Sequence, residues 1–210
     1  MFEGTYPKKA QDAFIRWLRK NDVVRHEDIE AHLKNFRVWS PSARKTMYVS
    51  CWRLGNYELE AMWRIYCGTD NGIAIALPYK DMFSAVVTAG PTKADINKAV
   101  PMVGQVTCMN FREETYEPGN AFGLAMHKRQ EFEYESEVRI VRYIASVGNG
   151  DYVDPPADAR LSVPIPWPAN LTQKIVFSPY ARSWYKGIVR ETVERLAPAL
   201  SARVSESSMN

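Results

Sequence analysis

The chain has 210 residues, of which 46% are hydrophobic and 24% are charged, as is typical of globular proteins. This length is enough for one ordinary domain with a sizeable core, and the composition excludes disorder over most of the chain. The formal net charge of +3 is too small to indicate nucleic-acid binding by itself.

Cysteine and histidine usage argues against a metal site and a disulfide framework. The three cysteines, Cys51, Cys67 and Cys108, are odd in number, widely spaced and without a CxxC pair, which fits a reducing cytoplasm. The three histidines form neither an HExxH motif nor an i, i+4 pair. No apolar run approaches a membrane span, and the first residues lack the apolar segment of a signal peptide. We therefore expect a cytoplasmic protein with reduced cysteines, no bound metal and no membrane partner.

Helical and extended patterns follow one another through the first third of the chain. Apolar residues at helical spacing predict a basic amphipathic helix that contains Ala10, Ala13, Phe14, Trp17 and Leu18. We expect its charged face to lie in solvent, with contact to nucleic acid or a membrane as the alternative. A second, shorter helix is predicted from Ile29, Leu33 and Phe36, and a strand from the β-forming residues 46–52.

The pattern after this strand predicts a helix, a turn and a buried strand. Asn56 is expected to cap a helix that carries Leu59, Met62, Trp63 and Tyr66 at helical spacing, with Met62 and Trp63 in the core. A turn at 68–72 then leads to an apolar strand at 73–77.

The remaining elements are less regular. An irregular helix is expected at 79–98, a strand at 103–111, a short helix at 122–130 and a charged strand at 133–144. Two strands near 161–165 and 174–178 precede a last helix, for which Ser178 is the expected N-cap and Pro179 the first-turn residue. Helices and strands mix without βαβ alternation, which favours a single α+β domain over residues 1–200. We expect a central, mostly antiparallel sheet flanked by helices, and a flexible polar tail at 201–210.

The charged strand is the most informative segment. Alternate side chains of a strand share a face, so Glu133, Glu135, Glu137 and Arg139 are expected on one side. Tyr134, Val138 and Ile140 are then expected on the opposite side, against the core. This alternation predicts that the charged side chains line a polar cleft, with Lys128 and Arg129 at its rim. The alternative is a solvated edge strand with a structural Glu137–Arg139 pair.

Two carboxylates in this segment have spacing that suits catalysis. The Cα atoms of Glu135 and Glu137 would lie about 6–7 Å apart on a strand, and like charges at that range raise at least one pKa. Such a group can orient a hydroxyl or stabilise a cationic transition state, and Arg139 would temper the repulsion. A metal-dependent nuclease is a weaker interpretation, because arginine cannot act as the base that a lysine would supply there.

The strand at 46–52 offers groups for a planar ligand. Tyr48, Ser50 and Trp52 alternate onto one face, so that face presents two rings and a hydroxyl. Among the standard short motifs, GxGxxG, the P-loop, GxSxG and the EF-hand loop are all absent.

Together these segments resemble an uncharacterised bacterial and phage domain-of-unknown-function family, often found near abortive-infection and other defence genes. The resemblance runs over residues 46–197 and rests on VSCW at 49–52, AMWRIY at 61–66, GIAI at 72–75, KR..F..E.E.R at 128–139 and IVFSPYARSW at 175–184. Members of that family begin with a strand and an acidic turn. Residues 2–5 resemble only the end of that turn, so the first strand of the family is expected to be missing.

A second, looser resemblance concerns mechanism. The order of a serine-containing strand, a short helix, a glycine-led apolar strand and a Glu-x-Glu strand is similar to that of ADP-ribosyltransferases. This resemblance implies an ADP-ribosyltransferase-like fold and NAD as the cofactor. It makes Ser50 the serine that supports the nicotinamide pocket, Glu135 the accessory carboxylate and Glu137 the catalytic one. Arg37 is the candidate for the arginine that holds NAD.

The first functional hypothesis is therefore an NAD-dependent, ADP-ribosyltransferase-like enzyme in a defence or toxin context. Glu137 would stabilise the oxocarbenium-like ribose, Glu135 would position the acceptor and Arg139 would hold the pair. Stacking on nicotinamide or adenine is assigned to Trp52 and Tyr66, and phosphate contact to Lys128 and Arg129. The alternative is a non-catalytic module that binds a nucleotide, a nucleic acid or a protein through the same basic and aromatic surface. The sequence does not specify the acceptor.

Overall fold

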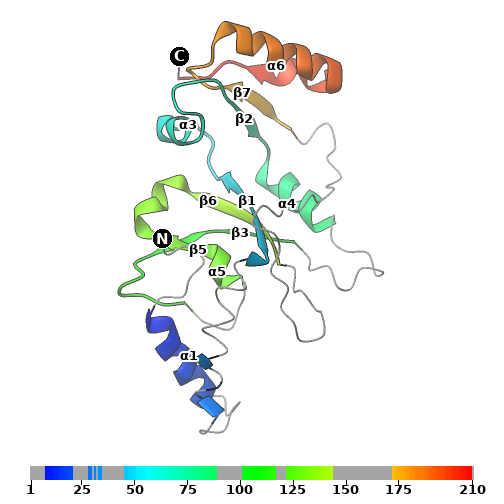
Figure 1. The fold of residues 1–210 in the computed structure, drawn as a ribbon. Helices are drawn as coiled ribbons and strands as arrows, with labels where there is room; N and C mark the ends of the chain where they lie inside the picture. The colour runs from blue at the N-terminus through cyan, green and yellow to red at the C-terminus, as the bar shows by residue number, and fades with distance from the viewer. Residues whose placement is uncertain are drawn as a thin grey trace. The chain divides into compact units, whose positions relative to one another are not determined.

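The computed structural model describes residues 8–20, 28–29, 31, 33–34, 45–88, 101–116, 122–143 and 172–209. These residues form helices and three small sheets, which confirms the predicted α+β class (Figure 1). The strands are distributed over three sheets rather than gathered in one central sheet. The chain divides into two compact units, each built from two segments. Met1–Arg53 and Gly90–Val163 form the first unit, and Leu54–Ala89 and Pro164–Asn210 form the second.

A three-stranded antiparallel sheet organises the first unit. Its order is β1 (Met47–Arg53), β6 (Glu137–Tyr143) and β3 (Met102–Gln105), so β6 lies in the middle. A parallel pair, β4 (Thr107–Met109) and β5 (His127–Arg129), forms a second sheet of this unit. The strand predicted at 103–111 is therefore two strands, separated at Val106, whose amide donates to the Glu137 carbonyl at 2.8 Å.

The helices described over their full length in this unit are α1 (Lys8–Lys20), α5 (Gly123–Met126) and the 3-10 helix η2 (Gln130–Glu135). α1 confirms the first predicted helix and buries Ala10 and Leu18, which are 0% and 2% exposed. The second predicted helix is described only at scattered positions, of which 29, 31, 33 and 34 are helical. Phe36 lies outside the described residues. The helix predicted at 122–130 ends at Met126, where β5 begins.

The core of the first unit lies where α5 covers the sheet. Val141 from β6 and Leu124 from α5 are almost completely buried there, and Val138 is buried on the opposite face of β6, where it pairs with Trp52. A side chain at Gly104 would overlap Met126, so glycine permits α5 to approach β3 closely. The ring of Tyr116 stacks on His127 with their centroids 3.9 Å apart.

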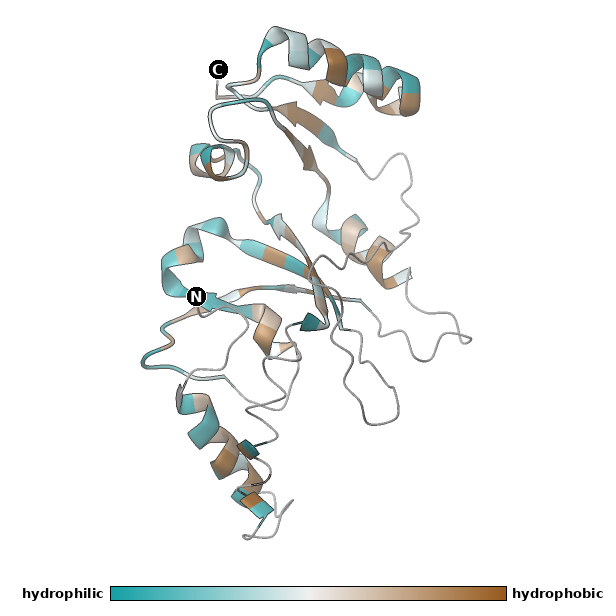
Figure 2. Ribbon diagram, viewed as in Figure 1, coloured by the Kyte–Doolittle hydropathy of each residue, from teal (hydrophilic) through white to brown (hydrophobic). Residues whose placement is uncertain are grey.

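The second unit contains the remaining elements. Its sheet has the order β2–β7–β8, antiparallel between β2 and β7 and parallel between β7 and β8. β2 and β7 are the hydrophobic strands drawn in brown in Figure 2. The elements in chain order are α3 (Glu60–Cys67), β2 (Ile73–Ala76), α4 (Tyr79–Thr88), β7 (Lys174–Phe177), α6 (Ser183–Leu196), the 3-10 helix η3 (Pro198–Arg203) and β8 (Val204–Ser205).

The C-terminal residues are part of this unit, so the predicted frayed tail is wrong. β8 pairs with β7, and Arg203 donates to the Thr172 carbonyl. The carboxylate of Glu58 accepts hydrogen bonds from the side chains of Ser207, Ser208 and Trp63 and from the Ser208 amide, at 2.7 to 2.9 Å. Burial opposes ionisation of Glu58, but these donors hold its pKa below the usual value.

Two predicted helix caps are also wrong. α3 begins at Glu60 after Leu59, not at Asn56, and no side-chain hydrogen bond caps it. α6 begins at Ser183 after Arg182. Ser178 instead extends the β2–β7 pairing through a bond from its amide to the Gly72 carbonyl, so it ends a strand rather than starting a helix.

Two other predicted elements extend beyond the described residues. The helix predicted at 79–98 is described as far as Thr88, and the strand predicted near 161–165 lies outside the described residues. Within the described residues, no helix is both long enough and apolar enough to cross a membrane.

The contribution of Trp63 to the core of the second unit can be measured by substitution. It is 6% exposed, as predicted, whereas Met62 is only half-buried. Trp63→Ala should lower the free energy of unfolding by roughly 3–5 kcal/mol, because it empties a large aromatic site. Tyr66→Ala on the same helix is the matched control, since Tyr66 is 65% exposed and should cost less than about 0.5 kcal/mol. Urea unfolding of both variants measures this, and equal midpoints would contradict the assignment of Trp63 to the core.

Candidate functional site

The charged segment is not one continuous strand. Residues Gln130–Glu135 form η2, and β6 begins only at Glu137. Between them Ser136 adopts a left-handed conformation with φ of 43°, and its amide donates to the Glu133 carbonyl. The predicted alternation therefore fails before Glu137. Glu133 is exposed, and Tyr134 is 45% exposed on η2 rather than packed in the core.

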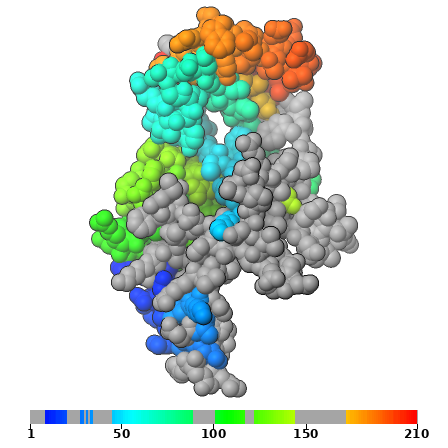
Figure 3. Space-filling view, in the orientation of Figure 1, coloured from blue at the N-terminus to red at the C-terminus, as the bar shows by residue number. Residues whose placement is uncertain are grey.

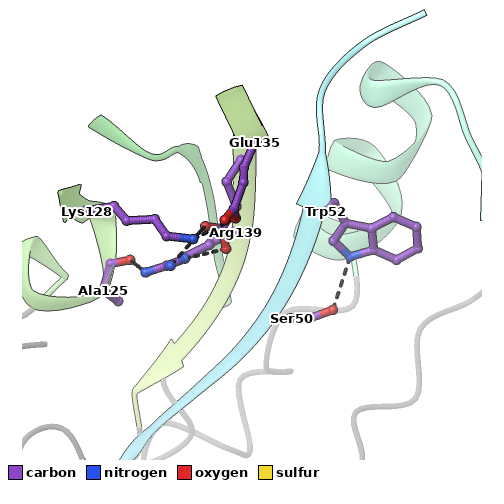
Figure 4. A network of polar contacts seen from close by, with 7 residues as sticks. Ser50, Trp52, Ala125, Lys128, Glu135 and Arg139 are labelled. Atoms are coloured by element: carbon purple, nitrogen blue, oxygen red, sulfur yellow. Dashed lines mark hydrogen bonds and ion pairs between the residues drawn. The ribbon is translucent and has the colours of Figure 1, made fainter. Parts of the chain in front are cut away.

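The turn at Ser136 nevertheless directs Glu135 toward β6. Lys128, Glu135, Glu137 and Arg139 form a connected group, which we call the buried charge cluster (Figure 4). The Lys128 Nζ atom lies 2.6 Å from Glu135 Oε2 and 3.1 Å from Glu137 Oε2. Arg139 donates to both oxygens of Glu137, from Nε at 2.7 Å and from Nη2 at 3.0 Å.

Burial and charge balance are the main properties of this cluster. Its four residues are between 5% and 7% exposed, and two positive groups balance two negative ones. Arg139 also donates from Nη1 to the Ala125 carbonyl at 2.6 Å, which ties β6 to α5. Buried charges are tolerated when they are paired and hydrogen-bonded in this way, and removing one partner leaves an uncompensated charge.

The cluster shifts the pKa values of Glu137 and Lys128. Burial alone would raise the pKa of Glu137, but hydrogen bonds and charge from Arg139, with further bonds from Cys51 and Lys128, lower it to about 2. Burial alone would lower the pKa of Lys128, and its two carboxylate partners raise it instead. Both groups are therefore held in their charged forms at neutral pH.

Cys51 is coupled to this cluster from β1, where it pairs with Arg139 across the sheet. Partial burial of the thiol and its hydrogen bond to the Glu137 carboxylate raise its pKa to about 11. The residue as a whole is exposed. Cys51, Cys67 and Cys108 form no disulfide in the structure.

The predicted cleft geometry differs from this arrangement. Glu135, Glu137 and Arg139 do come together, but they are buried rather than exposed on the floor of a cleft. Lys128 is not at a rim, because it is buried between the two carboxylates. Arg129 is half-buried, and its guanidinium lies over the Phe132 ring, 5.0 Å from the centroid.

The opposite face of the same sheet carries the other predicted residues. Residues directly paired in an antiparallel sheet share a face, and faces alternate along each strand. Trp52 pairs with Val138, Ser50 with Ile140 and Tyr48 with Arg142, whereas Glu137 pairs with Arg53. We call this surface the aromatic face; its members are Tyr48, Ser50, Trp52, Val103, Gln105, Val138, Ile140 and Arg142.

One hydrogen bond orders the aromatic face. The indole Nε1 of Trp52 donates to Ser50 Oγ at 3.1 Å, and both residues project to the side of β1 away from the buried charge cluster (Figure 4). Trp52 and Tyr48 are half-buried, while Ser50 and Gln105 are exposed. This face therefore presents aromatic, hydroxyl, amide and guanidinium groups above an aliphatic base.

The structure does not bring all the predicted site residues together. Ser50 and Trp52 lie on the sheet face opposite Glu137 and Arg139. Tyr66 belongs to the second unit, where it is exposed on α3, and Arg37 lies outside the described residues.

Some members of these two faces were not predicted. No local sequence pattern indicates Gln105 or Arg142, because their places follow from the pairing of β3 and β1 with β6. The pairing of Lys128 with Glu135 and Glu137 could have been predicted from the sequence. The two carboxylates and Arg139 alone leave one uncompensated negative charge, which a nearby cation must balance if they are buried.

Comparison of the chain with family models, with curated proteins and with solved structures found no match. The two resemblances described above therefore stay predictions.

The cluster has little capacity for metal chemistry. Among the described residues, no group of three or more His, Cys, Asp or Glu side chains could hold a metal ion. Both oxygens of Glu137 are occupied by Arg139, and Glu135 is paired with Lys128. The geometry suits a structural ion-pair network that fixes η2 and α5 to β6.

The lowered pKa of Glu137 predicts an acid-dependent loss of stability. Its ionised form stabilises the fold above the unfolded-state pKa near 4.5, and this contribution is lost as the pH falls toward 2, at a cost of roughly 3 kcal/mol. The Glu137→Gln variant lacks this titration. Its deficit in unfolding free energy relative to wild type should therefore be largest at neutral pH and shrink by about that amount near pH 2. Denaturant unfolding across this range measures the deficit, with the exposed Glu133→Gln as control. A deficit that does not change with pH would contradict the assignment.

Cys51 provides a second readout of the same carboxylate. Because Glu137 helps to raise its pKa, Cys51 should react slowly with iodoacetamide at pH 8 despite its exposure. Glu137→Gln should speed alkylation at Cys51, as followed by peptide mass spectrometry, with Cys67 as the internal reference. Unchanged rates at Cys51 in a folded variant would show that the two groups are not coupled.

Proposed function

We propose that the first unit is a non-catalytic module that binds a nucleotide, free or within a single-stranded nucleic acid, on the aromatic face. The observation that carries this proposal is the register of β1 against β6, which separates Trp52, Tyr48 and Arg142 from Glu137. The described residues of this face supply stacking rings and a cation but no carboxylate. Such a surface is suited to binding a base and its phosphate, and lacks the acid that glycosidic chemistry would need.

Trp52 and Tyr48 supply the stacking. Aromatic side chains on a sheet bind unstacked bases with little regard to sequence, since every base has a π face. The hydrogen bond to Ser50 satisfies the indole N–H and fixes the ring orientation, which reduces the entropy lost on binding.

Arg142 supplies the complementary charge. It lies directly across from Tyr48, and its Nε is buried without a hydrogen-bond partner among the described residues. A buried guanidinium donor without a partner costs free energy, and an anionic group bound at this face would remove that cost. A phosphate bound next to a stacked base fits both observations.

The ADP-ribosyltransferase-like enzyme requires a different geometry. It needs Glu137 to contact ribose on the same surface as the rings, while Glu137 is buried, doubly bonded to Arg139 and on the other face. NAD would therefore be bound by its bases and phosphates and not turned over.

The cysteine content fits our placement of this module in the cytoplasm.

Fluorescence anisotropy with a labelled oligouridylate tests the proposal. Trp52→Ala should weaken binding roughly 5- to 150-fold, the equivalent of 1–3 kcal/mol for one lost stacking contact. Trp184→Ala is the control, because Trp184 is exposed on α6 in the second unit and should have no effect. Wild-type affinity in a folded Trp52→Ala variant would refute the assignment of the aromatic face.

Two further ligands separate the alternatives. AMP and NAD should compete with the oligonucleotide if one base and its phosphate are sufficient, and only longer strands should bind if several bases are needed. NAD should be recovered intact after incubation with the protein. Release of nicotinamide that disappears in Glu137→Gln would instead support the enzyme hypothesis.

A further inference from the structure

α1 carries a basic face that the proposed function has not used. Lys9, Arg16, Arg19 and Lys20 are exposed and lie, with Asp12, on the side of the helix opposite Ala10 and Leu18. Residues three, four and seven positions apart share a helix face, which places Arg16 beside Arg19 and Lys20. Four basic groups and one acidic group give this face a net charge of +3. α1 is the blue helix of Figures 1 and 3, and part of it lies on the surface in view.

Three of these charges belong to side chains whose ion pairs can be compared with the rest of the described chain. Within the described part of the chain, Arg16, Arg19 and Lys20 have no carboxylate within ion-pair distance. Lys9 is different, because its Nζ donates to the Glu113 carbonyl at 2.9 Å and so fastens the start of the helix to its unit. The group Arg16, Arg19 and Lys20 is therefore a cationic patch on a helix that is anchored elsewhere, and we call it the α1 patch.

The surroundings of the patch favour nucleic acid over a membrane. An amphipathic helix that binds a bilayer inserts its apolar face between the lipids. In α1 the centre of that face is buried within the protein, with Ala10 0% and Leu18 2% exposed, while Trp17 beside it is 37% exposed. The opposite face offers a partner charged side chains, which match a phosphate backbone bound by electrostatic contacts independent of sequence.

We propose that the α1 patch binds the phosphates of a single-stranded nucleic acid whose base is held at the aromatic face. This inference rests on the proposed function, and both surfaces belong to the first unit. It assigns the partner as a polymer rather than a free nucleotide, because three neighbouring cations without an ion-pair partner among the described residues fit several phosphates. Base stacking and phosphate contact are then supplied by different elements.

The salt dependence of binding tests this inference. Each phosphate contact on a single strand contributes a slope of about −0.7 to the plot of log K against log salt concentration. The triple variant Arg16→Gln, Arg19→Gln and Lys20→Gln should therefore lower the magnitude of the slope by about 2 for a labelled oligouridylate. The single variant Arg16→Gln should lower it by about 0.7, and it provides the same test with less change to the helix.

A matched control separates local contact from the total charge. Lys80→Gln, Lys174→Gln and Arg195→Gln remove the same charge from exposed positions of the second unit and should leave the slope unchanged. An equal change of slope in both triple variants, or no change in the α1 variants, would overturn this inference.

The two proposals can fail independently. If Trp52→Ala weakens binding while the α1 variants keep the wild-type slope, the aromatic face stands and the α1 patch does not. If Trp52→Ala has no effect while the α1 variants change the slope, the proposed function fails and the patch acts alone. Circular dichroism melting should confirm that the α1 variants are folded, since all three side chains are exposed.

Discussion

The double hydrogen bond between Glu137 and Arg139 is the interaction on which the first unit depends. Both residues lie on the middle strand of a three-stranded sheet, so their position is fixed by pairing on both sides. Arg139 continues the contact to the Ala125 carbonyl, and Lys128 joins Glu137 to Glu135. One carboxylate thereby connects the sheet to α5, to β5 and to η2. None of these four charges is dispensable alone, because each neutralises a buried neighbour.

The same interaction decides what the sheet can do. With Glu137 and Glu135 enclosed on one face, the chemistry available to a ligand is that of the other face, where Trp52 and Ser50 are hydrogen-bonded to each other. A carboxylate such as Glu137, which holds the fold together at a lowered pKa, is a poor candidate for a group that must exchange protons near neutral pH. The function proposed above follows from this arrangement, in which one face of the sheet holds the buried ion pairs and the other is left to contact a ligand.

Local patterns in the sequence predicted much of the fold but little of its long-range pairing. The amphipathic α1, the β-rich β1 and the buried Trp63 follow from periodicity and composition, which depend on neighbours in the chain. The turn at Ser136 could not be predicted in this way, since a left-handed serine has no distinctive signal in its flanking residues. The C-terminal residues are held in place by hydrogen bonds to Glu58, which lies about 150 positions away in the chain.

For the candidate site, the sequence predicted which side chains of β1 share a face but not which residues of β6 they pair with. Alternation along one strand is a local property, so Tyr48, Ser50 and Trp52 share a face as expected. Which face of β1 matches which face of β6 depends on register, and a shift of one residue would have placed Trp52 beside Glu137. No single-sequence pattern fixes that register.

Ultraviolet cross-linking of a bound oligouridylate, followed by peptide mass spectrometry, tests the central claim most directly. If the aromatic face is the binding surface and the buried charge cluster is structural, the adduct should map to β1 at Tyr48 or Trp52. An adduct confined to the segment from Lys128 to Arg139 would contradict this account, because it would require the buried charge cluster to open and contact the nucleotide.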